Sequence, residues 1–316
     1  MGIETGTPTA APASRVRRLD RLAPWLAAPV ALRRLALASV IANVGIVVTG
    51  GAVRLTDSGL GCPTWPTCTG SSLVVTKKLG IHGAIEFTNR TMTFLVGAVL
   101  LITLVAAWRQ RREVRLAAIG LASIPAQAVL GGLVVHTDLN PWLVATHFLL
   151  SAGIVAVTFL LWWRVTDHRA DPIPTGGVIL ARATAAVAAL VLVIGTVVSG
   201  SGPHAGDVKN GRVHRIHIST SGLAQLHADA VMVLIGLSVG MLALAYALRL
   251  AEPVRRAAGL LLAVELAQGA VGYTQFFLHV PPVLVALHML GACLVWLAAL
   301  RMLLCVEPAL DGSRSP

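Results

Sequence analysis

Two stretches of this chain repeat each other: "AQAVLGGLVVHTDLNPWLVATH" from Ala126 to His147, and "AQGAVGYTQFFLHVPPVLVALH" from Ala267 to His288. They align without a gap over 22 positions, at a constant offset of 141 residues. A shared composition would produce scattered Ala and Val matches, but here the Gln, Gly, Pro and His positions also stay in register. The pattern therefore predicts an internal duplication.

Composition places this duplication in a membrane. Hydrophobic residues make up 56% of the 316 residues, charged residues only 12%, and the mean hydropathy is +0.78, whereas soluble domains average about 45–50% and 25%. Windows of about 20 apolar residues can cross the hydrocarbon core. Eight such windows are present, near 35–53, 80–107, 115–136, 142–163, 178–200, 222–248, 255–279 and 282–304.

The repeat organises these spans. It places span three on span seven, with an even number of spans between them, so the two repeats share one orientation. The predicted fold class is an all-α membrane protein whose eight transmembrane helices form two tandem-duplicated four-helix bundles. The predicted segments are a cytoplasmic tail at 1–34, an N-terminal bundle at 35–164, a C-terminal bundle at 165–305 and a cytoplasmic tail at 306–316.

Positive charge is distributed unevenly between the predicted loops. Of the 25 Lys and Arg residues, 18 fall on the side of the N-terminus, six fall on the opposite side, and Arg90 lies within a span. Cytoplasmic loops carry such an excess, so we expect a cell-membrane protein with both termini in the cytoplasm. Topology thus accounts for the net charge of +11, and we expect no nucleic-acid partner.

Histidines recur near the outer ends of the even-numbered spans. His147 and His288 lie six residues after Pro141 and Pro282, and His227 lies a few residues into span six. Ionisable side chains inside a membrane are costly and call for a reason. Two helices that present histidines at similar depth can hold a haem between axial imidazoles. The alternative is a set of histidines that hydrogen-bond to neighbouring helices.

Span two carries the densest polar group, "IHGAIEFTNR", with His82, Glu86, Asn89 and Arg90. At 100° per residue these side chains fall mostly on one helical face. An i, i+4 pair of Glu86 and Arg90 would lower the cost of burying either charge. Either the pair is structural, or the carboxylate faces a buried ligand or reacting centre.

The loop after span one contains "GCPTWPTC", which holds Cys62 and Cys68. Disulfides persist outside the cytoplasm, where the predicted topology places this loop. A Cys62–Cys68 disulfide and two free thiols in a capping loop are the alternatives. In the loop after span five, His204, His214 and His217 are expected to be solvated rather than to bind metal.

These residues together resemble the haem A synthase family, membrane enzymes that convert haem O into haem A for cytochrome oxidase. The resemblance covers the eight spans. It rests on "GGAVRLTDSGLGCPTWPTC", "IEFTNR", "GPHAGD" and the repeated His147 and His288. It implies a haem b in the C-terminal bundle and the substrate haem O in the N-terminal bundle. There the C8 methyl would be oxidised to a formyl group by successive hydroxylations.

The resemblance also implies roles for individual residues. His227 and His288 would bind the haem b iron, His147 would face the iron of the substrate haem, and Glu86 would be the catalytic or structurally essential carboxylate. Arg90, together with Asn89 and His82, is expected to help bind the substrate haem. Cys62 and Cys68 match the cysteine pair that forms a disulfide in family members that have it.

The chain departs from the family at one position. The better-known pattern reads Glu-x-x-His-Arg, whereas here Glu86 is followed by Asn89 and Arg90. Aligning "LAQLH" of span six on "IEFTN" likewise puts His227 opposite Asn89. His82 lies two turns further out on the same face and is a candidate replacement ligand. If His147 is the only ligand, the iron of haem O keeps an open site.

The implied partners are a haem O donor, which would be a haem O synthase, and an electron donor that the sequence does not identify. A homo-oligomer is compatible with the sequence. The alternative function is a b-type membrane cytochrome that transfers electrons from quinol, for which His147, His227 and His288 would serve equally well.

Overall fold

Proline marks the start of four of the eight long helices. In the computed structural model, which describes residues 23–168, 171–206 and 214–307, proline occupies one of the first two positions of α2, α5, α8 and α9. Its missing N–H would be unpaired there in any case. These helices are Pro29–Leu55, Pro141–Val165, Glu252–Phe277 and Pro282–Val306.

The other long helices are α3 Gly80–Gln110, α4 Val114–His136, α6 Thr175–Ser201 and α7 Thr220–Ala247, and two short 3-10 helices lie at Pro24–Ala27 and Lys77–Leu79. All eight long helices have the length and apolar composition to cross a membrane. The predicted all-helical fold with eight spans is confirmed. The first helix begins at Pro29 rather than near 35, so Arg33 and Arg34 are helical. Residues 1–22 and 308–316 of the two predicted tails lie outside the described residues. Two of the lysines and arginines counted in the charge bias, Lys209 and Arg212, also lie outside them.

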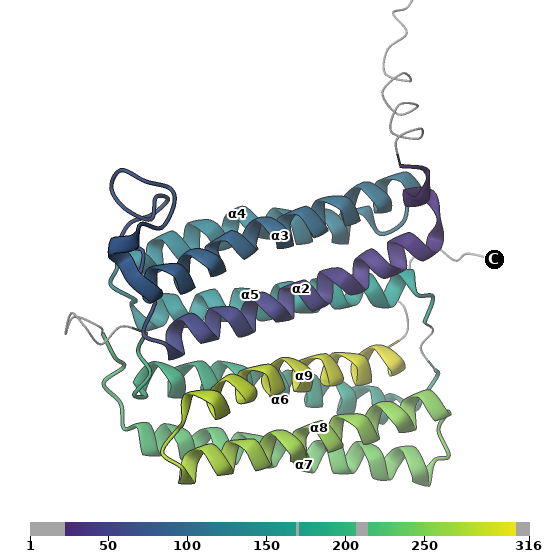
Figure 1. The fold of residues 1–316 in the computed structure, drawn as a ribbon. Helices are drawn as coiled ribbons and strands as arrows, with labels where there is room; N and C mark the ends of the chain where they lie inside the picture. The colour runs from purple at the N-terminus through teal and green to yellow at the C-terminus, as the bar shows by residue number, and fades with distance from the viewer. Residues whose placement is uncertain (1–22, 169–170, 207–213, 308–316) are drawn as a thin grey trace, which may run out of the picture.

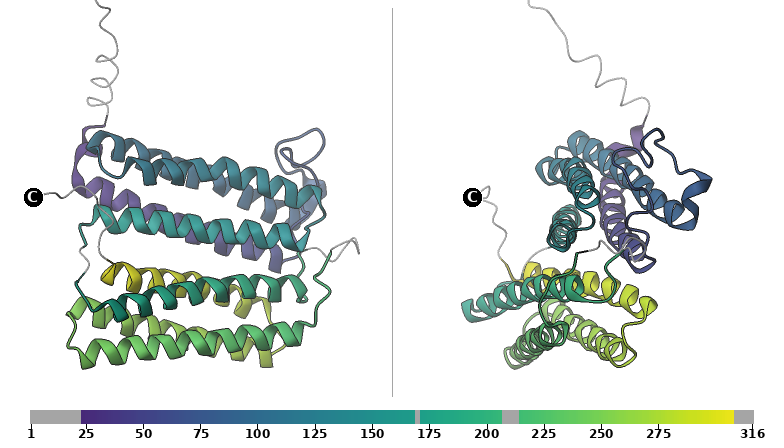
Figure 2. Two further views of the ribbon diagram at one scale, coloured as in Figure 1. Left: turned by 180° about the vertical axis from the view of Figure 1, so that it is seen from behind. Right: turned by 90° about the vertical axis from the view of Figure 1, so that its left-hand side faces the viewer.

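The helices form two groups of four (Figures 1 and 2). In the first group α2 and α4 each pack on α3 and α5, and in the second α6 and α8 each pack on α7 and α9. Contacts between the groups run from α2 to α9 and from α5 to both α6 and α9. We call these groups the N-terminal bundle and the C-terminal bundle.

The duplication is visible in the backbone conformation as well as in the amino-acid sequence. After α4, Asp138 and Leu139 have φ angles of 48° and 60°, and after α8, His279 and Val280 have φ angles of 60° and 62°. Positive φ is rare for residues other than glycine, and rarest for a β-branched residue such as valine. The same pair of unusual conformations recurs at the same offset of 141 residues, which supports the register read from the repeat.

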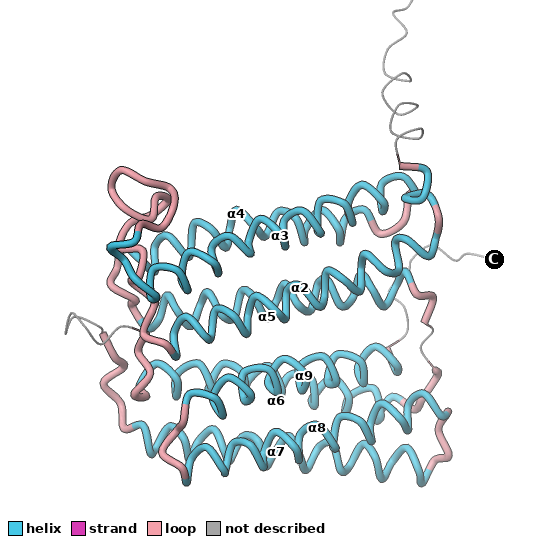
Figure 3. The backbone as a smooth tube through the Cα atoms, in the orientation of Figure 1, coloured by secondary structure: helices cyan, strands magenta, loops and turns pink. Residues whose placement is uncertain are grey.

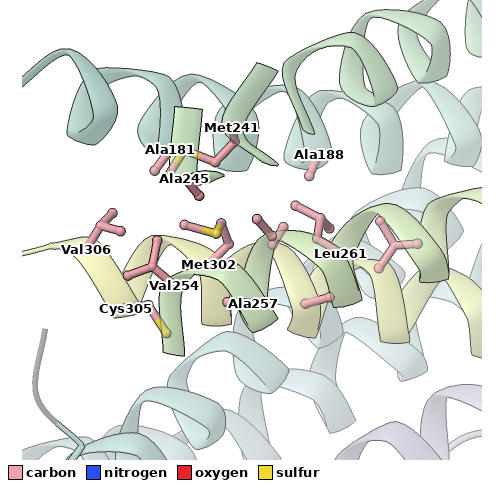
Figure 4. Close-up of a cluster of buried hydrophobic side chains, with 14 of the residues drawn as sticks. Ala181, Ala188, Met241, Ala245, Val254, Ala257, Leu261, Met302, Cys305 and Val306 are labelled. Carbon is pink, nitrogen blue, oxygen red and sulfur yellow. The ribbon is translucent and has the colours of Figure 1, made fainter. Parts of the chain in front are cut away.

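The two ends of the bundles differ. One end carries loop 56–76 and the loops after α4, α6 and α8, and we call it the disulfide end (Figure 3). The large buried apolar clusters lie in the helix halves remote from it. In the C-terminal bundle, one of these clusters contains residues of all four helices, α6, α7, α8 and α9. Examples are Ala181, Met241, Val254 and Met302 (Figure 4). The polar residues singled out in the sequence therefore lie beyond the main apolar cores.

Candidate functional site

Three histidine rings pack against glycines of neighbouring helices. A Cβ added at Gly195 of α6 would lie 3.1 Å from Cε1 of His227. Gly272 of α8 stands in the same relation to His288, also at 3.1 Å. In the N-terminal bundle Gly131 of α4 faces His147 at 3.4 Å. The absent side chains let each ring lie directly on a helix backbone.

The fourth equivalent position holds an amide. Gly50 of α2 faces Asn89 of α3, with 3.9 Å between the position of an added Cβ and Nδ2 of Asn89. Each bundle thus pairs its first helix with its second, and its third helix with its fourth, through a glycine and a polar side chain. The C-terminal bundle presents two imidazoles, and the N-terminal bundle presents His147 and Asn89.

The pair in the C-terminal bundle has the dimensions of a haem-ligand pair. The ring centres of His227 and His288 are 6.4 Å apart. A metal held at about 2 Å from each imidazole nitrogen, with half a ring width on each side, requires a similar separation. Among the described residues no three His, Cys, Asp or Glu side chains form a metal-ion cluster. Two imidazoles at this separation match the ligand set of a haem iron, whereas a structural zinc site takes four ligands.

The two nitrogens of each of these histidine rings have different surroundings. The Nδ1 atoms of His147, His227 and His288 are buried, and within the described part of the chain none has a hydrogen-bond partner. For His227 the Val191 carbonyl, one turn before Gly195 on α6, lies beside the ring as an acceptor for its N–H. The Cε1–Nδ1 edge of each ring faces the glycine of the neighbouring helix, which leaves Nε2 as the nitrogen available to a bound group. A haem between His227 and His288 would be held through these Nε2 atoms.

A glutamine holds the histidine helix in each bundle, but in two different ways. Gln268 of α8 donates from Nε2 to the His288 carbonyl at 2.7 Å, and Gly291 leaves room for its amide. The equivalent Gln127 of α4 donates to Oγ of Ser151 at 2.8 Å, and its distance to the His147 carbonyl is 3.4 Å. The backbone of His288 is therefore fixed more directly than that of His147.

Glu86 and Arg90 pair inside the N-terminal bundle. Glu86 is 5% exposed, and its Oε1 accepts from Nε of Arg90 at 3.0 Å and from Nη2 of the same side chain. Its Oε2 accepts the backbone N–H of Cys62 at 2.7 Å. Arg90 also donates to the carbonyls of Thr64 at 2.8 Å and Cys62 at 3.0 Å. The pair therefore holds the disulfide loop (Cys62–Cys68) on α3.

The disulfide loop is closed and buried at its base. Cys62 and Cys68 form the predicted disulfide, and both are at most 1% exposed. The loop carries Trp65 across to α4, where a Cβ added at Gly132 would come within 2.7 Å of the indole ring. Gly132 directly follows Gly131, which faces His147. The loop therefore connects the Glu86–Arg90 pair to the helix wall beside His147.

The remaining predicted histidines have other surroundings. Nδ1 of His82 lies 3.1 Å from Oγ of Ser58 in the loop after α2, so the structure brings His82 to this loop and not to the Gly50–Asn89 pair. The His204 ring donates to the Val280 carbonyl at 2.8 Å. His214 and His217 are exposed.

Two further contacts join the bundles. Arg54 of α2 donates to the carbonyls of His204 at 2.6 Å and Ser199 at 2.7 Å. Next to Gly50, Gly51 has no side chain where Met289, the neighbour of His288, packs against α2. The two adjacent glycines of α2 therefore contact residues of different bundles, Asn89 and Met289.

A family model described as cytochrome oxidase assembly protein (COX15-CtaA) matches residues 33–84 and 80–300. The chain belongs to this family. The match covers both bundles, including all the site residues described above. The family resemblance drawn from the sequence is thereby confirmed.

Individual relatives in this family match over shorter segments. Proteins named Heme A synthase from Alkalihalophilus pseudofirmus, Lysinibacillus sphaericus and Halalkalibacterium halodurans are 34%, 33% and 31% identical over 137, 135 and 137 residues. Each alignment covers 41% of this chain and 46%, 43% and 45% of the respective relative. The chain therefore aligns with less than half the length of these relatives.

One buried acid was missed by sequence reasoning. Glu265 of α8 is 2% exposed, and its Oε1 accepts a hydrogen bond from Ser238 of α7 at 2.8 Å. Its Oε2 is buried without a partner among the described residues. A single acidic residue inside a span was the available signal, but its repeat equivalent is Ile124, so the duplication gave it no emphasis.

Proposed function

We propose that this member of the cytochrome oxidase assembly family is a haem A synthase, a membrane oxidoreductase that converts the C8 methyl of haem O to a formyl group by successive hydroxylations. One observation carries the proposal. Three histidine rings lie with their Cε1–Nδ1 edges on glycines at equivalent positions of two repeated bundles, which leaves their Nε2 atoms for a bound group. The names of the relatives support the same activity.

The two bundles would bind different haems. His227 and His288, with rings 6.4 Å apart, would hold a resident haem b in the C-terminal bundle. His147 would hold the iron of the substrate haem O in the N-terminal bundle. The bound haems supply the redox chemistry. The chain supplies the ligands, their spacing and the apolar helix surfaces around them.

Glu86 would act in the N-terminal bundle together with Arg90. Both carboxylate oxygens accept hydrogen bonds, one from Arg90 and one from the Cys62 backbone. This geometry favours a positioning role within the proposed site: the carboxylate keeps the disulfide loop and its Trp65 against α4. The closed loop would exclude water from the substrate side of the bundle, while Arg90 balances the buried charge.

The proposed setting follows from the charge bias. The disulfide end would face the outside of the cell membrane, so the histidines would lie near the outer face and both termini in the cytoplasm. A haem O synthase would deliver the substrate, and a separate electron donor would reduce the protein. Self-association into a homo-oligomer is compatible with this arrangement.

The test is to purify the full chain in detergent, extract its haems and identify them, for the native protein and for Glu86→Ala. Haem b together with haem O or haem A is expected in the native protein. The variant should accumulate haem O or a partly oxidised haem. Glu252→Ala, on the exposed start of α8, is the control and should match the native protein. Haem b alone, with no conversion of added haem O, would favour an electron-transfer cytochrome instead.

A further inference from the structure

The amide of Asn89 is fixed to the wall of its own bundle. Its Nδ2 donates to Oγ1 of Thr49 on α2 at 2.9 Å. The Thr49 hydroxyl in turn donates to the Ile46 carbonyl at 3.2 Å, so its oxygen is free to accept from Asn89. Thr49 directly precedes Gly50. The helix residue that faces Asn89 and the residue that orients it are therefore neighbours in sequence.

Asn89 keeps unused hydrogen-bonding capacity. A primary amide has two N–H donors and a carbonyl acceptor. The bond to Thr49 is its one side-chain hydrogen bond within the described residues, which leaves one N–H and Oδ1. Asn89 is half-buried. An amide of this kind is a poor ligand for haem iron, whose protein ligands are His, Cys, Met or Tyr, but it is a good donor to a polar group.

We propose that the iron bound by His147 has no protein ligand on its second axial side, and that Asn89, oriented by Thr49, hydrogen-bonds a small molecule bound there. This inference rests on the proposed function. It assigns the N-terminal bundle an iron site open to small diatomic or anionic ligands. The C-terminal bundle has imidazoles at both equivalent positions and is closed to such ligands.

The surroundings of His82 favour Asn89 as the residue at this position. His82 lies seven residues before Asn89 on α3, which corresponds to about 10 Å along the helix axis. Its ring nitrogen interacts with Ser58 in the loop. Gly50, by contrast, faces Asn89 at the position where Gly195 faces His227, although at 3.9 Å rather than 3.1 Å. The position that carries an imidazole in one bundle therefore carries the amide in the other.

An iron site with one histidine ligand can be recognised spectroscopically. A haem with one histidine ligand is high-spin in the ferric state and binds cyanide, whereas one with two histidines is low-spin and resists cyanide. We would load the purified full chain with ferric haem O, record electron paramagnetic resonance spectra and titrate cyanide. The native protein should show a low-spin signal from the C-terminal bundle and a cyanide-sensitive high-spin signal from the N-terminal bundle.

Four variants sharpen the measurement. Asn89→His should convert most of the high-spin signal to low-spin and weaken cyanide binding at least about tenfold. Asn89→Leu should remain high-spin but bind cyanide roughly fivefold more weakly, which is the range for one lost hydrogen bond. Thr49→Val should show a smaller change in the same direction. The reciprocal variant His227→Asn should create a second high-spin, cyanide-binding haem in the C-terminal bundle.

Two results would overturn the inference in different ways. If haem O binds but the native protein is entirely low-spin and inert to cyanide, both axial positions are occupied. The open-site inference then fails while the proposed function stands, and His82→Ala would reveal whether His82 is the second ligand. If haem O does not bind although haem b does, the proposed function fails and takes the inference with it.

Discussion

The two bundles share one helix arrangement, but their equivalent side chains pack against the glycines at different distances. In the C-terminal bundle both histidines approach the Cβ positions of their glycines to 3.1 Å, whereas in the N-terminal bundle the corresponding distances are 3.4 and 3.9 Å. Gln268 bonds directly to the His288 backbone, while Gln127 bonds chiefly to Ser151. The repeated bundles thus contain the same glycine and polar-residue arrangement twice. Under the proposed function, the tighter arrangement would hold the resident haem b and the looser, loop-covered arrangement would hold the substrate haem.

The loop cover gives the largest expected difference between the bundles. Arg90→Leu would leave Glu86 as a buried carboxylate without its cation, which typically costs about 3–5 kcal/mol. Arg256→Leu is the matched control, because Arg256 and Glu252 form an i, i+4 pair whose side chains are 73% and 48% exposed. We expect no measurable change there. Unfolding in detergent, monitored by circular dichroism, measures both variants.

A second measurement tests whether the loss belongs to the loop. The disulfide of Arg90→Leu should be reduced and labelled by a thiol reagent faster than that of the native protein. Adding Glu86→Gln should recover part of the stability, since the neutral amide can still accept from the Cys62 backbone. Equal destabilisation by Arg90→Leu and Arg256→Leu would show that burial of the first pair has no energetic importance.

The glycines provide the next test. Gly272→Ala places a methyl group 3.1 Å from the His288 ring, and overpacking costs about 1–3 kcal/mol, which outweighs the gain of about 1 kcal/mol in helix propensity. Gly131→Ala meets His147 at an ordinary contact distance of 3.4 Å. It should be neutral or slightly stabilising. Thermal unfolding, together with the absorption spectrum of the proposed haem b, measures both variants. Identical effects on the two would contradict the difference in packing distance.

Substitutions of the two glutamines should have smaller effects than those of the glycines. Gln268→Leu removes the 2.7 Å hydrogen bond to the His288 carbonyl, a loss of about 1 kcal/mol. It should also shift the reduction potential of the haem b that we propose His288 binds. Gln127→Leu should leave that potential unchanged, because its main partner is Ser151. A redox titration of purified protein measures this difference. Equal potentials in all three proteins would show that Gln268 does not position His288.

The smallest effect is expected at the end of the bundles remote from the disulfide. Asp167 accepts hydrogen bonds from Arg112 at 2.6 Å and Arg33 at 2.7 Å, and these arginines, Arg112 foremost, lower the pKa of its carboxyl. A lowered folded-state pKa means that the stabilisation is complete above the pKa of an unfolded-chain aspartate. It is lost as the pH falls through the folded-state value.

Because Asp167 is exposed, salt screens this contribution and it should stay below about 1 kcal/mol. The stability difference between the native protein and Asp167→Asn, measured from neutral to acidic pH at low salt, should shrink towards zero in acid. Asp57→Asn, in the loop after α2, serves as the control for a general charge effect. A difference that grows on acidification would contradict the assigned sign.

Much of the fold could be predicted because a membrane leaves few choices. Backbone polar groups must pair within each span, so apolar windows become helices, and prolines such as Pro141 and Pro282 mark where two of them begin. The repeat then identified equivalent histidines. Periodicity along one helix also predicted the Glu86–Arg90 pair, because i and i+4 side chains are neighbours whatever surrounds them.

Contacts between segments could not be predicted in the same way. Nothing in the spacing of Glu86 shows that its second oxygen accepts the Cys62 N–H, or that Trp65 lies on Gly132. Gln127 and Gln268 stood out in the repeat, but their partners depend on how closely two helices approach. Such distances are set by tertiary packing, which a single sequence does not display.

The adjacent glycines of α2 have a consequence for electron transfer between the two proposed sites. Gly50 faces Asn89 in one bundle, and Gly51 lies against Met289, the neighbour of His288 in the other. With no side chain on either residue, the wall between the bundles at this level consists of the α2 backbone and the Met289 side chain that packs on it. If each bundle holds a haem as proposed, electrons that pass between the two haems would cross this single helix.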